Sequence, residues 1–146
     1  MADADVYKAL RQYGEVRLRS EVERASPHRL IQMLMEGALD KIRTARLHMQ
    51  RGNRAEKARH VSWAIAIVEG LQQALDMERG GEIAANLDQL YDYMQRRLVL
   101  ANMENDPALL DEVEGLLREI KEAWDAVPAL LEREAGAAAA AQAGGR

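Results

Sequence analysis

The sequence predicts an all-α protein, an antiparallel four-helix bundle, and three observations favour this fold. Hydrophobic residues make up 48% of the chain, yet aromatic residues are only 4% and phenylalanine is absent, so the core must be aliphatic. Alanine, leucine and methionine, which would fill much of such a core, have high helix propensity, as do glutamate, glutamine and arginine. Apolar residues also recur at alternating spacings of three and four, which is the pattern of near-antiparallel bundle packing.

Proline and glycine residues mark the ends of the expected helices. Pro27 suits a first helical position, because the N–H that proline lacks has no partner there, and Ser26 suits the N-cap before it. Gly80-Gly81 suits the left-handed conformation that follows a helix end. The expected helices are Pro27 to about Gln50, Arg54 to Asp76, Glu82 to Asn105, and Pro107, capped by Asp106, to the residue before Pro128. Their short connections make consecutive helices antiparallel neighbours.

Each of the last three helices carries one stripe that we expect to face the core. The second helix offers Ala58, Val61, Ile65, Val68 and Leu75. The third offers Ile83, Leu87, Leu90, Met94, Leu98 and Ala101, and the fourth offers Leu110, Val113, Leu117, Ile120, Trp124 and Val127.

The two ends of the chain differ from the bundle, which we assign to residues 26–127. Residues 1–25 mix a helical face (Val6, Leu10, Tyr13) with an alternating pattern (Val16, Leu18, Val22), and we interpret them as a flexible arm. Residues 128–146 form a C-terminal extension. Pro128 to Glu134 is compatible with a short fifth helix, and the alanine-rich remainder is expected to fray into disorder.

Composition narrows the possible functions. A net charge of −4 argues against a nucleic-acid partner, and the absence of cysteine excludes disulfides and thiolate metal sites. The first residues, Met1 to Val6, lack the basic and apolar regions of a signal peptide. No stretch reaches the ~20 apolar residues that span a bilayer. We therefore expect a cytoplasmic protein that does not insert into membranes.

No pattern of an active site is visible in the sequence. Di-iron bundles use Glu-x-x-His pairs, and none of His28, His48 and His60 has a glutamate three positions before it. The three histidines are expected to be solvent-facing or helix-terminal, with no metal site. No serine lies in a Gly-x-Ser-x-Gly turn. We therefore expect no enzyme, no cofactor and no catalytic residue. A small helical enzyme or cofactor bundle is the disfavoured alternative.

What remains is more apolar helix surface than one bundle needs. On the second helix, Trp63, Ile67, Gly70 and Ala74 fall nearly opposite the stripe centred at Val61. On the first helix, Met33 and Leu47 point away from the face that contains Leu34 and Ile42, and Leu30 and Gly37 lie between. These faces either bind a partner or are covered by the N-terminal arm or the C-terminal extension. The two readings are compatible, since an arm can cover a groove until a client arrives.

Two long segments resemble the flagellar secretion chaperone FliS family. They are Ser26-Pro-His-Arg-Leu-Ile-Gln-Met-Leu34 and Leu90-Tyr-Asp-Tyr-Met-Gln-Arg-Arg-Leu98, within a resemblance that spans Ser26 to Val127. The resemblance implies a cytoplasmic helical bundle that binds the disordered C-terminal segment of flagellin, prevents premature polymerisation and supports flagellar type III secretion. It also implies an N-terminal tyrosine over part of the groove, for which Tyr13 is the best match, and it leaves room for other flagellar regulators or export-gate proteins as partners.

The surplus apolar positions and this resemblance together give a set of candidate client-binding residues. They are Tyr13, Leu30, Met33, Leu47, Trp63, Ile67, Gly70, Ala74 and Tyr93. Tyr93 joins the set because it lies on the shoulder of its helix stripe, where its ring could meet a partner. The alternative function is a helical adaptor or structural bundle that binds an amphipathic helix of another protein.

Overall fold

The computed structural model describes residues 21–144, and all regular structure in that range is helical. After one helical turn at residues 21–24 come four long helices: α3 (Pro27–Arg51), α4 (Arg54–Gln73), α5 (Met77–Glu104) and α6 (Pro107–Gly144). The prediction of an all-α bundle is confirmed. Tyr13 and the rest of residues 1–20 of the expected arm lie outside the described residues.

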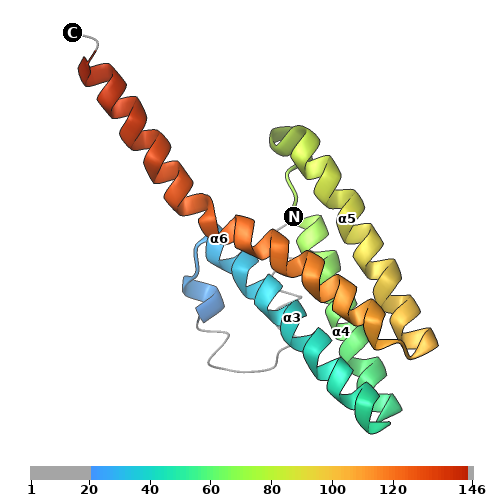
Figure 1. Cartoon of the computed structure of the whole chain (residues 1–146). Helices are drawn as coiled ribbons and strands as arrows, with labels where there is room; N and C mark the ends of the chain where they lie inside the picture. Colours follow the sequence, from blue (N-terminus) through green and yellow to red (C-terminus); the bar gives the residue numbers. More distant parts are fainter. Residues whose placement is uncertain (1–20, 145–146) are drawn as a thin grey trace.

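The four helices close into a ring of neighbours (Figure 1). α3 packs against α4 and α6, and α5 packs against the same two helices. The α3–α4 and α5–α6 turns lie at one end of the bundle, where Lys57 Nζ donates hydrogen bonds to the Asn102 carbonyl at 3.1 Å and to Asn105 Oδ1 at 3.0 Å. We call this the closed end. The opposite end, which contains the α4–α5 connection, is the open end.

Local capping explains where most of these helices begin and end. Ser26 Oγ accepts a hydrogen bond from the Arg29 backbone N–H at 3.1 Å, as expected for an N-cap before a proline. Gly52, with φ 76°, ends α3 in the left-handed conformation that glycine adopts without strain. Asp106 Oδ1 accepts from the Ala108 N–H at 3.0 Å and begins α6.

The junction between α4 and α5 differs from the prediction. α4 ends at Gln73, and α5 begins at Met77, because the Asp76 side chain caps a new helix by accepting from the Arg79 N–H at 3.0 Å. Gly81 does have positive φ (51°), but it interrupts the first turns of α5 and does not stop α4. The acidic cap therefore outweighed the glycine pair as a boundary signal.

The C-terminal boundary was also predicted wrongly. α6 continues through Pro128 to Gly144, so Pro128 to Glu134 extends α6 and does not form a separate fifth helix, and residues 136–144 remain helical. A proline removes one backbone hydrogen bond, whereas the alanine-rich sequence after it strongly favours helix. Residues 128–144 are exposed, and α6 bends as it leaves the bundle (Figure 1), as helices containing proline commonly do.

The core is aliphatic, as the composition required, and the central pair α3 and α4 supplies most of it. Its largest fully buried side chains are Leu34, Met35, Ile42, Val61, Ile67, Val68, Leu71, Met94, Leu98, Leu110, Val113 and Leu117. Val22, from the turn before α3, is also part of this cluster.

The prediction of an outward-facing apolar stripe on α4 is wrong. Ile67 and Gly70 are buried, while Ile65, assigned to the core stripe, is only half-buried. α4 packs against α3 on one side and α5 on another, so its buried surface is wider than a single stripe. Leu30 and Met33 of α3 are buried for the same reason, since α3 lies between α4 and α6.

This assignment predicts the relative cost of two substitutions on α4. Ile67→Ala should lower the free energy of unfolding by about 2–5 kcal/mol, because it leaves a cavity in the core. Ile65→Ala should cost no more than about 2 kcal/mol, since part of its side chain is already in water. Urea denaturation of both variants measures the difference. Equal losses would contradict the burial of Ile67.

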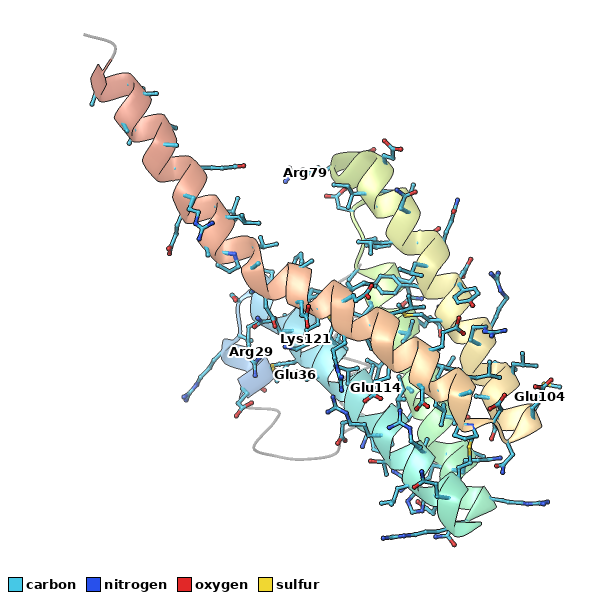
Figure 2. All side chains as sticks on the ribbon, in the orientation of Figure 1. Arg29, Glu36, Arg79, Glu104, Glu114 and Lys121 are labelled. Carbon is cyan, nitrogen blue, oxygen red and sulfur yellow. The ribbon has the colours of Figure 1, made fainter. Side chains whose placement is uncertain are left out.

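An ionic cluster at the border of the α3–α6 contact joins these two helices. Glu114 accepts hydrogen bonds from Arg43 Nε at 2.7 Å and from Arg46 Nη2 at 2.6 Å, and Arg46 also pairs with Asp111 at 2.8 Å. Figure 2 shows Glu114 between the two helices. Burial alone would raise the pKa of the Glu114 carboxyl, but the hydrogen bonds and charges of Arg43 and Arg46 outweigh it and hold the pKa below its usual 4.5.

The lowered pKa of Glu114 predicts an acid-sensitive contribution to stability. This contribution is complete above the unfolded pKa of 4.5 and is lost as pH falls through the lower folded pKa. Glu114→Gln should therefore lower the melting temperature at pH 7 and flatten its decrease between about pH 5 and 3. The matched control is Glu119→Gln, at an exposed position of the same helix. An unchanged acid slope in Glu114→Gln would refute this role.

Candidate client-binding surface

The apolar stripe of α5 that was expected to face the core is buried at one end of the helix and exposed at the other. Ala101, Leu98 and Met94 are fully buried. Leu90 and Leu87, one and two turns closer to the open end, are half-buried and pack against the edge of the core. Ile83, the last apolar residue of the same stripe, is 73% exposed. One continuous helix face thus passes from core to surface.

The stripe of α6 shows the same gradient in the opposite chain direction. Leu110, Val113 and Leu117 are fully buried, whereas Ile120, Trp124 and Val127 are half-buried. Leu131, one turn further, is 60% exposed. Because α5 and α6 are antiparallel, both stripes become exposed at the open end.

These residues form one candidate surface, which we call the open-end surface. It consists of Ile83, Leu87, Leu90, Ile120, Trp124, Val127 and Leu131. α5 and α6 meet at their connecting turn and diverge toward the open end (Figure 1), which explains why neither helix covers the other's stripe there. Core-type residues exposed along two diverging helices are typical of a surface that accepts an amphipathic helix.

Polar contacts fix α6 against α3 at this end. Trp124 Nε1 donates to the His28 carbonyl at 3.0 Å, and its ring stacks on the His28 ring with centroids 4.7 Å apart. Gln32 donates to Asp125 Oδ1 at 2.8 Å. A hydrogen bond from Lys121 at 2.8 Å lowers the pKa of Asp125, so this carboxylate stays ionised. The α6 side of the surface is therefore positioned before any partner binds.

A second polar cluster joins α5 to α6. Tyr93 donates its hydroxyl to Glu112 Oε2 at 2.6 Å, and Arg97 Nε donates to Glu112 Oε1 at 2.7 Å. The bond to Glu112 raises the pKa of Tyr93, while the same bond and Arg97 lower that of Glu112. The neighbouring Tyr91 is buried, which raises its pKa to about 12. Tyr93 thus has a half-buried ring and a hydroxyl engaged by the bundle.

The structure does not gather the sequence-predicted candidate residues on one exposed face. Leu30, Met33, Ile67 and Gly70 are buried, Ala74 and Tyr93 are half-buried, and Leu47 is 42% exposed. Trp63 is half-buried, with Lys41 Nζ 3.8 Å and the Arg59 guanidinium carbon 5.6 Å from its ring centroid. The open-end surface was missed, since its residues had all been assigned to core stripes or, as Leu131, to the extension.

The structure also brings together three metal-type ligands that sequence inspection missed. Donor atoms of His48, Glu56 and His60 lie within 4.8 Å of one another at the closed end. His60 is only 7% exposed, so the expectation that all three histidines are solvent-facing or terminal is wrong for it. Glu56 and His60 are four residues apart and so do not match the Glu-x-x-His pattern, but this spacing also places two side chains on one helix face.

Within residues 21–144, no helix combines the length and apolarity that a membrane crossing requires. A helical bundle with apolar residues left uncovered at one end is the architecture of a protein that binds another polypeptide. Comparison with known proteins agrees with this class. The family model described as flagellar protein FliS matches residues 9–130.

Curated relatives extend the match over most of the chain. The flagellar secretion chaperone FliSB of Pseudomonas aeruginosa is 52% identical over 82% of this chain and 95% of its own length. FliS of Vibrio cholerae is 44% identical over 82% of this chain and 88% of its own length. FliS of Salmonella typhimurium is 49% identical over 79% of this chain and 86% of its own length. The chain belongs to the FliS family, which confirms the resemblance, and is a flagellar secretion chaperone rather than an enzyme.

The exposure gradient on α5 predicts very different costs at its two ends. Ile83→Ala should change the free energy of unfolding by no more than about 0.5 kcal/mol, because the side chain is already in water. Met94→Ala should cost about 2–5 kcal/mol, because Met94 is fully buried. Thermal or urea unfolding compares them. A large loss in Ile83→Ala would show that the open-end surface belongs to the core.

Proposed function

We propose that this chain is a cytoplasmic export chaperone that binds the C-terminal segment of flagellin, prevents its premature polymerisation and supports flagellar type III secretion. The observation that carries the proposal is the joint exposure of the α5 and α6 core stripes at the open end, in a chain of the FliS family. Family resemblance supplies the identity of the client, and the open-end surface supplies a place for it.

The physical chemistry of the surface suits a client that folds on binding. A disordered segment loses conformational entropy when it becomes ordered, which costs about 2–5 kcal/mol or more. Burial of apolar area offsets that cost at about 25 cal/mol per Å². A client helix between α5 and α6 would complete a layer that the bundle leaves open, with anchors at spacings of three and four residues. The same client residues would then be unavailable for assembly into a filament.

The positions of other candidate residues suggest how a longer client would extend beyond this surface. Leu47 and Trp63 lie on the α3–α4 side and are partly accessible, so they are proposed as further contacts of a wrapped segment. Tyr13, from the arm, is proposed as the cover that the client displaces. Leu30, Met33, Ile67 and Gly70 are buried, so a role in binding would require the bundle to open.

Co-expression with flagellin tests the proposal. Full-length flagellin should co-elute with the chain in size exclusion as a stoichiometric complex, whereas flagellin lacking its last ~40 residues, about 60 Å as a helix, should not. Equal binding of the truncated client would refute the proposed mode. Capture of another protein's amphipathic helix with no flagellin complex would favour the adaptor alternative.

Two charge substitutions on α5 locate the binding surface. Ile83→Glu places a carboxylate in the open-end surface and should weaken flagellin binding by about tenfold or more, because the charge must be buried against apolar groups. Met103→Glu is the matched control, since Met103 is 75% exposed on the same helix but near the closed end. Titration calorimetry compares the two variants. Equal affinities would place the client elsewhere on the bundle.

A further inference from the structure

The closed end contains a cluster of two imidazoles and a carboxylate that the chaperone role does not use. His48 comes from the last turn of α3, while Glu56 and His60 come from α4 on the other side of the Gly52 turn. Their ligand atoms lie within 4.8 Å of one another, and the His48 and His60 ring centroids are 5.2 Å apart. Two imidazoles and one carboxylate are a ligand set that zinc accepts, with a fourth position left for water.

The hydrogen bonding of His60 prepares it as a ligand. Its Nδ1 lies 2.8 Å from the Glu56 carbonyl oxygen, to which Nδ1–H donates, and 3.8 Å from Glu56 Oε2, so the lone pair of the ring is on Nε2. A backbone carbonyl on the second ring nitrogen is a common way to orient metal-bound histidines. On His48, Nδ1 lies 3.3 Å from Asn53 Nδ2. Both rings are therefore held by neighbouring groups at the turn.

The charges around the cluster discriminate between classes of metal. Arg59 donates to Glu56 Oε2 at 3.1 Å. The Lys57 ammonium is nearby but is engaged by Asn102 and Asn105. One carboxylate beside these cations is too few for calcium or magnesium, which need several oxygen ligands. Imidazole donors instead favour first-row transition metals.

We propose that His48, Glu56 and His60 form a three-ligand site for a transition-metal ion, with zinc as the best match. Typical zinc–nitrogen and zinc–oxygen bonds of about 2.0–2.2 Å require the donors to approach by roughly 1.5 Å. The exposed Glu56 side chain can supply much of this movement by rotation.

Such an ion would fasten α3 to α4 at the closed end, away from the open-end surface. The inference goes beyond the proposed function, since metal binding and flagellin binding can succeed or fail separately. Its test uses the untagged full chain, freed of metal by chelator and dialysed. Cobalt(II) should give the intense visible bands of a tetrahedral site at one ion per chain, and zinc should compete for it. Zinc should also raise the melting temperature, and EDTA should reverse the increase.

Matched variants assign the ligands. His48→Gln and Glu56→Gln should each weaken zinc binding at least about tenfold, the scale on which even outer-shell partners act. His60 is not substituted in this experiment, because its side chain is buried. The controls are His28→Gln, at the other end of α3, and Glu69→Gln, exposed on α4, which should bind zinc like the parent chain. Folding of each variant is checked by circular dichroism. Substoichiometric cobalt binding, or equal zinc affinity in all four variants, would overturn the proposal.

Discussion

The packing of α3 against α4 is the interaction on which the rest of the bundle depends. These two helices supply most of the largest fully buried side chains, among them Leu34, Ile42 and Ile67. Each must bury two faces, because α3 also packs against α6 and α4 also packs against α5. A helix buried on two sides cannot present a simple amphipathic pattern, which is why the α4 sequence reads as having a surplus apolar stripe. α5 and α6 also have two neighbours each, but far fewer of their residues are buried.

The two ends of the bundle consequently have different physical character. At the closed end, short turns bring helix termini together, and polar groups such as Lys57 and Asn105 satisfy one another across them. At the open end, α6 follows α3 through the Trp124–His28 contact while α5 follows α4, so the two outer helices separate. Apolar residues such as Ile83 are left uncovered because α5 and α6 diverge at this end. Ionic contacts such as Glu114 with Arg43 then hold α6 against α3.

This division of the molecule explains how a chaperone can work without chemistry. On the proposed function, binding strength would come from apolar area that is already positioned, so the bundle would not need to reorganise to present it. The polar contacts between helices, Tyr93 with Glu112 and Gln32 with Asp125, are satisfied within the bundle. No nucleotide-binding loop is visible in the sequence, so release of a client would follow from competition or transfer to another protein. A metal at the closed end would add stability without touching this surface.

The sequence by itself determined the fold class, the helix starts at Pro27 and Pro107, and the aliphatic character of the core, because these depend on composition, local propensity and capping. It also determined the family, through long matching segments. The predicted helix ends were less accurate where two local signals competed. These signals were Asp76 and Gly81 at the start of α5, and Pro128 and the alanine-rich residues after it in α6. Only the tertiary structure decided which apolar residues are covered. Ile67 is buried and Ile83 exposed because burial depends on how neighbouring helices converge or diverge, and hydrophobic periodicity does not contain that geometry. The meeting of His48 with Glu56 and His60 likewise required the α3–α4 turn to fold.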